Sequence, residues 1–83
     1  MTKILLDARE MEHPRPFELS IRHLQTMNEE SYLYMLNQKL PTPLLELAKE
    51  KGFHYVTQKD AEENWHIIIS KNSTINLERF FDV

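Results

Sequence analysis

The stretch LDAREMEHPRP, residues 6–16, decides the fold that this chain is expected to adopt. A short aliphatic run, Ile4–Leu6, leads into it, and its charged residues end at two prolines that stand one residue apart. Apolar residues at helical spacing begin directly afterwards, at Phe17. This succession is typical of a strand that leads through a loop into a helix. We therefore expect a strand over residues 3–7 and a helix after the prolines.

The first helix is indicated by the apolar residues of Phe17–Met27, which recur on one face while polar residues occupy the other. Its start has two interpretations. Pro14 suits the first helical position, whereas Pro16 disfavours a helical conformation at Arg15. We expect the helix to end near Asn28, because asparagine tolerates the left-handed conformation of a helix cap.

A second helix is predicted from its two ends. Thr42 offers a capping hydroxyl, Pro43 tolerates the first helical turn, and Gly52 is the glycine that terminates the helix. The segment SYLYMLN is expected to be a strand, although its leucines and methionine also suit a helix. The predicted elements after the first helix are a strand at 31–37, the helix at 42–52, and strands at 53–59 and 65–71.

These elements predict an α+β fold in the order β-α-β-α-β-β. Right-handed crossovers place both helices on one face of a four-stranded mixed sheet, which makes a two-layer α/β sandwich. The first three strands then run parallel, and the acidic turn at 60–64 joins the last two strands as an antiparallel hairpin. We assign this domain to residues 1–71 and treat residues 72–83 as a C-terminal tail.

The opposite face of the predicted sheet lacks a cover. Ile68 points toward that face by the alternation of strand side chains, so the face carries apolar surface. Apolar residues within 75–83 fall at helical spacing after Ser73 and Thr74, which can act as caps, so a short helix is expected there. Three interpretations of the tail stay open: a frayed end, packing across the sheet, or pairing with a second chain.

The composition narrows the classes of function. With 83 residues and 41% hydrophobic content, the chain is one soluble domain. A net charge of -3 does not provide the basic face that nucleic acid requires. The absence of cysteine excludes disulfides and thiolate chemistry, and the short N-terminal apolar run is neither a signal peptide nor a membrane span. We expect a cytoplasmic protein that binds neither nucleic acid nor membranes.

The proline-marked segment resembles the opening of the TusA-like (SirA-like) sulfur-carrier proteins, Leu-Asp-x-Arg-Gly-Leu-x-Cys-Pro-x-Pro. The resemblance extends over residues 3–71 and implies the two-layer fold. Glu10 replaces the glycine of that signature, and His13 replaces the cysteine that carries the persulfide. Because a persulfide requires a sulfur atom, sulfur-carrier chemistry should be absent. The matching residues are Leu6, Asp7, Arg9, Pro14 and Pro16.

The chain is more similar still to a cysteine-free sister family of unknown function. That family has a segment of the type Asn-Asp-His-Asp-Pro-x-Pro-Leu before the second helix. Gln38, Lys39 and Leu40 depart from the pattern, while Gly52-Phe53 and Trp65 suit the family. The residues that match the segment are Asn37, Pro41, Pro43 and Leu44.

One candidate site follows from the topology, because both helices start after the carboxyl ends of parallel strands. His13 would lie beside free N–H groups, where the helix dipole disfavours an imidazolium and leaves a neutral ring to relay a proton or bind a ligand. The alternative is a solvated loop edge on which His13 is an ordinary loop or cap residue. The residues of this candidate rim are Arg9, His13, Arg15, Asn37 and Lys39.

Other chemistry has little support in the sequence. The four histidines, at positions 13, 23, 54 and 66, match no close metal-ligand spacing, and no catalytic constellation is evident. We therefore expect a non-enzymatic module without cofactor that binds a protein partner or a small anion at the rim. The alternatives are a His13-dependent proton relay, metal site or transfer step, in a sulfur- or redox-related pathway by family analogy, and a structural role as a homodimer. The expected state is a monomer or weak homodimer.

Overall fold

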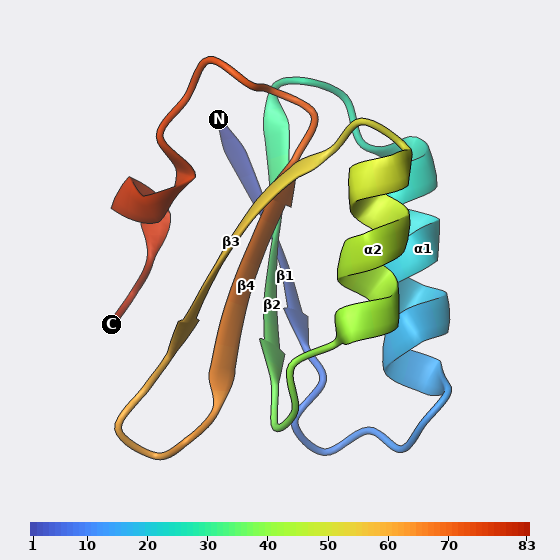
Figure 1. The fold of residues 1–83 in the computed structure, drawn as a ribbon, viewed down its shortest axis with the longest axis vertical. Coiled ribbons are helices and arrows are strands. Elements are labelled where there is room, and N and C mark those ends of the chain that lie inside the picture. The colour runs from blue at the N-terminus through green and yellow to red at the C-terminus, as the bar shows by residue number, and fades with distance from the viewer.

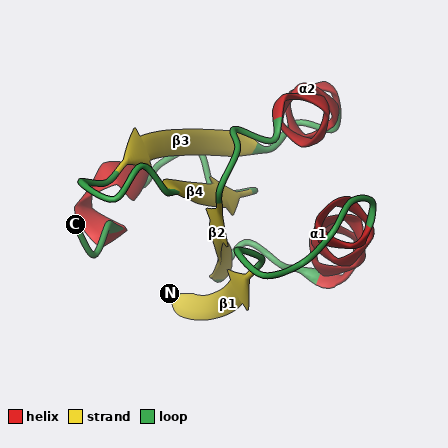
Figure 2. Ribbon diagram, turned by 90° about the horizontal axis from the view of Figure 1, so that it is seen from below, coloured by secondary structure: helices red, strands yellow, loops and turns green.

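The computed structural model describes residues 1–83 and confirms the predicted order of strands and helices. Figure 1 shows the sheet with α1 and α2 on one side and the C-terminal tail on the other. Figure 2, viewed from below, shows the same three layers. The elements are β1 (Thr2–Asp7), α1 (Arg15–Thr26), β2 (Ser31–Asn37), α2 (Thr42–Glu50), β3 (His54–Lys59), β4 (Trp65–Ser70) and the short 3₁₀ helix η1 (Leu77–Phe80).

The sheet has four strands in the order β1-β2-β4-β3. β1 pairs with β2 in parallel, and β4 is antiparallel to both β2 and β3. β3 therefore runs in the same direction as β1 and β2, which confirms the predicted mixed sheet. The crossover through α2 does not place β3 beside β2, because the last strand of the hairpin inserts between them.

The main core lies between the sheet and the two helices. Leu33 and Met35 of β2 and Ile67 and Ile69 of β4 are fully buried there, while Ile68 faces the opposite side, as the alternation predicts. Burying one such aliphatic side chain contributes about 1.5–3 kcal/mol, so this layer holds the helices on the sheet. The helices contribute Leu24, Leu44, Leu45 and Ala48.

The helix ends differ from the prediction at three places. α1 ends at Thr26 with Met27 as an extended cap (φ -71°, ψ 145°), so the left-handed cap expected at Asn28 is wrong. α1 includes Arg15, because a residue at the first helical position lies at the edge of the helix and accommodates a following proline. The expected hydroxyl cap at Thr42 is wrong: Thr42 is itself helical, its N–H bonds to the carbonyl of Leu40, and no side chain caps α2. Gly52, with a φ of 83°, ends the second helical segment as predicted.

The C-terminal tail packs across the outer face of the sheet, which is one of the three interpretations that the sequence leaves open. Leu77 joins Tyr32, Tyr34 and Ile68 in a second buried cluster on this face. The expected caps at Ser73 and Thr74 are wrong, since the side chain of Asn76 accepts the capping hydrogen bond of η1. The remaining tail residues packed on this cluster are Ile75, Phe80 and Phe81.

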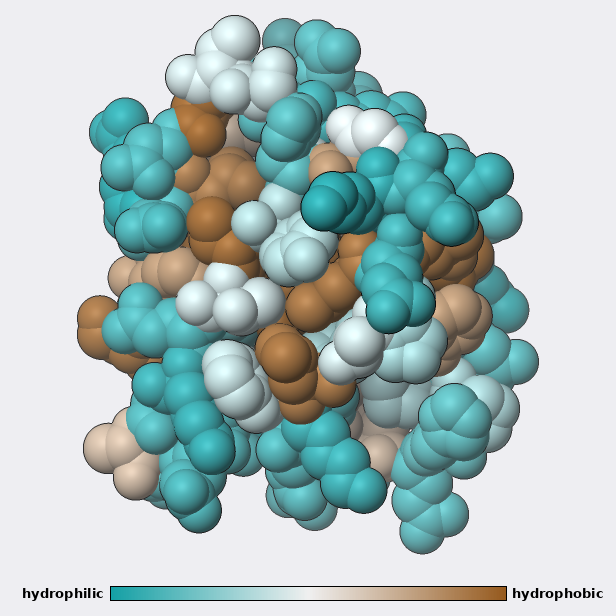
Figure 3. Space-filling model, in the orientation of Figure 1, coloured by the Kyte–Doolittle hydropathy of each residue, from teal (hydrophilic) through white to brown (hydrophobic).

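The surface is mostly hydrophilic. In the space-filling view (Figure 3), teal side chains cover much of the face toward the viewer and hydrophobic side chains show between them in smaller patches. Neither α1 nor α2 is long and apolar enough to span a bilayer. The apolar surface of the chain is therefore gathered mainly in the two clusters on either side of the sheet.

Candidate functional site

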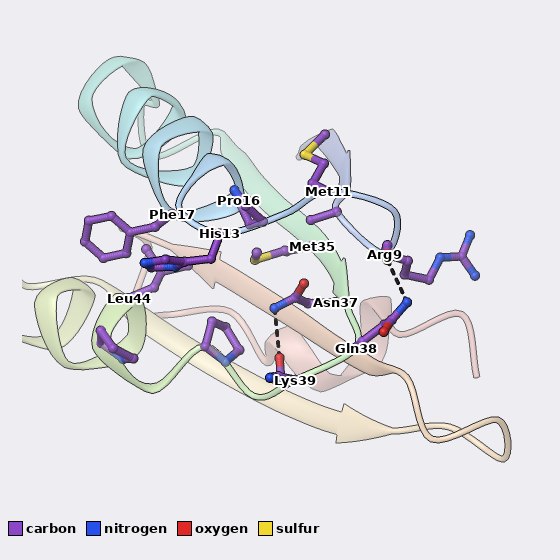
Figure 4. Close-up of a pocket in the computed structure, with 13 residues that line it drawn as sticks. Arg9, Met11, His13, Pro16, Phe17, Met35, Asn37, Gln38, Lys39 and Leu44 are labelled. Atoms are coloured by element: carbon purple, nitrogen blue, oxygen red, sulfur yellow. Dashed lines mark hydrogen bonds between the residues drawn. The ribbon is translucent and has the colours of Figure 1, made fainter.

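A cavity of about 300 Å³ opens where β1 and β2 end and the chain turns into the two helices. Figure 4 shows side chains from both loops and from both helix starts around it. This is the edge of the sheet at which the sequence predicted a site, since the carboxyl ends of parallel strands meet there. Its lining residues are Ala8, Arg9, Met11, His13, Pro16, Phe17, Met35, Asn37, Gln38, Lys39, Pro41, Pro43 and Leu44.

The base of the cavity is rigid and largely apolar. Met35 is completely buried, and its sulfur lies 3.6 Å from the hydroxyl oxygen of Ser20. The same hydroxyl donates to the carbonyl of Pro16 at 2.7 Å, which fixes the first turn of α1 against β2. The cavity thus has a preformed floor, which lowers the entropic cost of binding a ligand.

His13 lies at the mouth of this cavity. Its imidazole extends between Phe17 in the first turn of α1 and Leu44 in the first turn of α2 (Figure 4). The side chain is exposed, and among the histidines only His66 has ring nitrogens in hydrogen bonds. Both ring nitrogens of His13 are therefore available to a ligand.

Each helix start has one backbone N–H without an acceptor in the protein. In both helices the N–H of the first residue bonds to a carbonyl of the preceding turn, and the second residue is a proline. The N–H of the third residue has no acceptor in the protein; these residues are Phe17 in α1 and Leu44 in α2. The prolines thus reduce the expected set of free N–H groups to two, and both belong to residues that line the cavity.

Two amide side chains hold the loops around the cavity in place. Gln38 donates from Nε2 to the carbonyl of Arg9 at 2.7 Å and so ties the end of β2 to the loop after β1. Asn37 donates from Nδ2 to the carbonyl of Lys39 at 2.9 Å (Figure 4). Its Oδ1 has no hydrogen-bond partner, so Asn37 can accept a hydrogen bond from a ligand.

The three cations of the predicted rim differ in whether they line the cavity and in whether a carboxylate pairs with them. Arg9 forms a two-point ion pair with Asp7, at 2.9 and 2.7 Å, and its guanidinium points away from the cavity (Figure 4). This hydrogen-bonded pair lowers the pKa of Asp7 and offsets the charge of Arg9. Arg15 is exposed and lies outside the lining, whereas Lys39 lines the cavity and forms no ion pair. The structure thus gathers four of the five predicted residues, and Lys39 is the free cation among them.

A buried hydrogen-bonded chain of side chains on the other face of the sheet is not predicted from the sequence. His66, 7% exposed, contacts the Asp60 carboxylate through Nε2 at 2.9 Å and the Tyr34 hydroxyl through Nδ1 at 2.6 Å. The Tyr34 oxygen also accepts the N–H of Asp82, at 3.0 Å. The spacing of an aspartate six residues before a histidine across a hairpin turn is a usable signal, but the partner on β2 depends on strand pairing that the sequence does not give.

The hydrogen bonds and burial of these side chains shift the pKa values of Asp60 and Tyr34. The hydrogen bond from His66 lowers the pKa of Asp60, helped by the N–H groups of Asn64 and Glu62. Burial raises the pKa of Tyr34 and keeps its hydroxyl protonated. With Nε2 protonated, His66 donates to Asp60 while its Nδ1 accepts from the Tyr34 hydroxyl. Every buried side-chain nitrogen and oxygen of the protein therefore has a hydrogen-bond partner.

No three His, Asp or Glu side chains of residues 1–83 come together as a metal-binding group. His13 and His66 in particular lie in different parts of the fold: His13 lies at the cavity, and His66 lies under the tail on the opposite face of the sheet. Neither is part of a preformed cluster of metal ligands.

Comparisons with known proteins identify the family. No curated protein and no solved structure gives a significant match. A family model described as an uncharacterized conserved protein (DUF2249) matches residues 5–71. The matched span includes the cavity with both helix starts and ends directly after β4, before the tail. Since the match covers most of the chain, this protein belongs to the DUF2249 family.

Proposed function

We propose that this chain is a non-enzymatic binding module that takes a small anionic ligand in the cavity between the starts of α1 and α2. One observation carries the proposal: a preformed cavity lined by two residues whose N–H groups have no acceptor in the protein, Phe17 and Leu44, and by the unpaired imidazole of His13. Donors at the positive ends of helices favour a carboxylate or phosphate group.

The size and lining of the cavity support a small ligand with an apolar part. Its volume of about 300 Å³ is at the lower end of the roughly 300–1,000 Å³ that ligand pockets occupy. Met35 and Phe17 offer apolar contact, while Lys39 supplies positive charge that no protein carboxylate neutralises. Arg9 adds little charge, because Asp7 already pairs with it.

Binding is favoured over catalysis by the surroundings of His13. An imidazole that acts as a base is usually oriented by a second group, such as a carboxylate on its other nitrogen. His13 has no such partner, and neither Asp7 nor any other carboxylate lines the cavity. A ligand contact is therefore the simplest role for this side chain.

The proposal is tested by NMR with small anions. Acetate, a longer aliphatic carboxylate and inorganic phosphate are titrated into ¹⁵N-labelled protein, and we expect the largest shifts at the amides of Phe17 and Leu44. His13→Ala should weaken the response. His54→Ala, which removes an exposed histidine of β3, is the matched control and should leave the response unchanged. Shifts spread over the surface, or equal in both variants, would contradict the proposal.

We also propose that the family is related to the TusA-like sulfur-carrier proteins. The support is the segment that links β1 to α1, in which Asp7, Arg9, Pro14 and Pro16 match the signature of those proteins. In this chain His13 occupies the position of their cysteine. A thiol introduced there should therefore experience the environment of a helix start, which lowers the pKa of a thiol.

A further inference from the structure

The outer face of the sheet carries a second surface, and the C-terminal tail covers it. The family match ends at residue 71, so the tail lies outside the matched residues. Its Leu77, 4% exposed, seats against Tyr32, Tyr34 and Ile68. Figures 1 and 2 show the tail on the side opposite the helices.

The tail contacts this surface through its side chains and does not pair with the sheet as a strand. Phe80 stacks on Tyr32, with ring centroids 4.6 Å apart and planes 22° apart, and Phe81 meets Tyr34 edge-on at 6.3 Å. The N–H groups of Arg79 and Phe81 bond within the tail itself. Such a segment can leave the sheet without breaking any backbone pairing of β2 or β4.

A polar latch completes the contact at the end of the tail. The carboxylate of Asp82 pairs with Nζ of Lys3 at 2.7 Å. The backbone N–H of Asp82 donates to the hydroxyl oxygen of Tyr34. Nζ of Lys3 also lies 4.3 Å from the centre of the Tyr34 ring. His66 fixes the Tyr34 hydroxyl from below, so the receptor groups are in place before a segment binds.

The receptor surface extends beyond the tail. Leu5 pairs with Tyr34 across β1 and β2 and shares the face of Lys3, two residues away. It is 58% exposed and is the most exposed large hydrophobic side chain of the protein. A longer segment than the tail could therefore bury additional apolar surface beside the latch.

We propose that the outer sheet face is a docking surface for a segment of another protein with two successive aromatic residues followed by Asp or Glu, and that the tail occupies it as an intramolecular ligand. The two rings fill the places over Tyr32 and Tyr34, and the carboxylate meets Lys3. A tethered segment acts at an effective concentration of the order of millimolar, so a competing partner displaces it only when the partner binds more tightly. Contact with Leu5 supplies that additional affinity.

A synthetic peptide tests the proposal on the full chain. The fluorescent peptide NLERFFDV, residues 76–83, is titrated by anisotropy into the wild type and into the double variant Phe80→Ala, Phe81→Ala. We expect binding to the double variant about tenfold or more tighter than to the wild type, because the variant's own tail no longer competes. A peptide with both phenylalanines replaced by alanine should not bind.

The latch is tested in the same background. Adding Lys3→Ala to the double variant should weaken peptide binding severalfold, whereas adding Lys49→Ala, at an exposed lysine of α2, should not. Equal affinity for the wild type and the double variant, no binding to a folded double variant, or equal effects of the two lysine substitutions would each overturn the proposal.

A measurement on the wild type covers the case in which the double variant does not fold. Native-state hydrogen exchange should show the amides of Phe81 and Asp82 opening far more readily than those of Ile67–Ile69 in β4. If the tail amides exchange as slowly as those of β4, the tail is a fixed part of the core and the proposal fails.

Discussion

Replacing Tyr34 with phenylalanine removes one oxygen from the centre of the outer sheet face and leaves the ring in place. That oxygen is 2.6 Å from Nδ1 of His66 and 3.0 Å from the N–H of Asp82. The substitution therefore keeps the apolar packing and withdraws two hydrogen bonds at once. One of them belongs to a ring that is only 7% exposed and cannot turn to water.

The magnitude follows from the two partners. Leaving buried Nδ1 of His66 without a partner costs about 1–3 kcal/mol, and the bond to Asp82 at the exposed end of the tail contributes about 0.5–1 kcal/mol more. We expect Tyr34→Phe to lower the free energy of unfolding by about 1.5–4 kcal/mol. For a domain of this size, each 1 kcal/mol corresponds to a fall of roughly 4–8 °C in melting temperature.

Urea unfolding followed by circular dichroism measures this loss. Tyr55→Phe is the matched control, because Tyr55 is 38% exposed on β3 and its hydroxyl has no partner; its effect should stay within about 0.5 kcal/mol. If the free energy of unfolding of Tyr34→Phe lies within about 0.5 kcal/mol of the wild-type value, the buried hydrogen bonds from Asp60 to Tyr34 do not stabilise the fold.

Three further predictions concern other parts of the molecule. The pKa of Asp60 is lowered from its usual 3.8, so its carboxylate stabilises the fold above that pH, and the contribution disappears as the pH falls through the lowered pKa. Asp60→Asn should thus be less stable than the wild type at neutral pH, and the difference in unfolding free energy should shrink as the pH falls below 3.8; a constant difference would refute this. Gly52→Ala should lower the free energy of unfolding by about 1–2 kcal/mol because of the φ of 83° alone, since an added Cβ meets nothing within 4 Å; Gly52→Asn should lower it less. A Gly52→Ala variant that melts at the wild-type temperature would contradict this prediction. His13→Cys introduces the protein's single thiol, whose pKa should lie below the ordinary value of about 8.5 in a pH profile of alkylation; a value at or above 8.5 contradicts a helix-start environment.

Much of the fold could be predicted because its elements are marked by local physics. The three consecutive isoleucines of β4 can only alternate between two buried faces, and the structure places Ile68 opposite its neighbours. Gly52 adopts the left-handed conformation that glycine favours at a helix end. The helix starts are harder to predict, since a proline fixes its own φ but leaves open which neighbour begins the helix. The predicted cap at Thr42 is wrong for this reason.

The candidate site was predicted in place but not in detail. Topology alone brings His13, Asn37 and Lys39 to one cavity, because the loops that carry them follow adjacent parallel strands. Local sequence could not show that Arg9 turns to Asp7, two residues earlier, and away from the cavity. The contact between His66 and Tyr34, 32 positions apart, depends on which strands pair, and hydrophobic patterns do not encode that choice.

The position of β4 between β2 and β3 also has a consequence for synthesis on the ribosome. The strand that occupies the middle of the sheet comes after all its neighbours in the chain. Until Trp65–Ser70 has left the exit tunnel, one edge of β2 stays open and the nascent chain can at best assemble β1, α1 and β2. Stalled chains that end before this strand should therefore be recognised by chaperones or proteases.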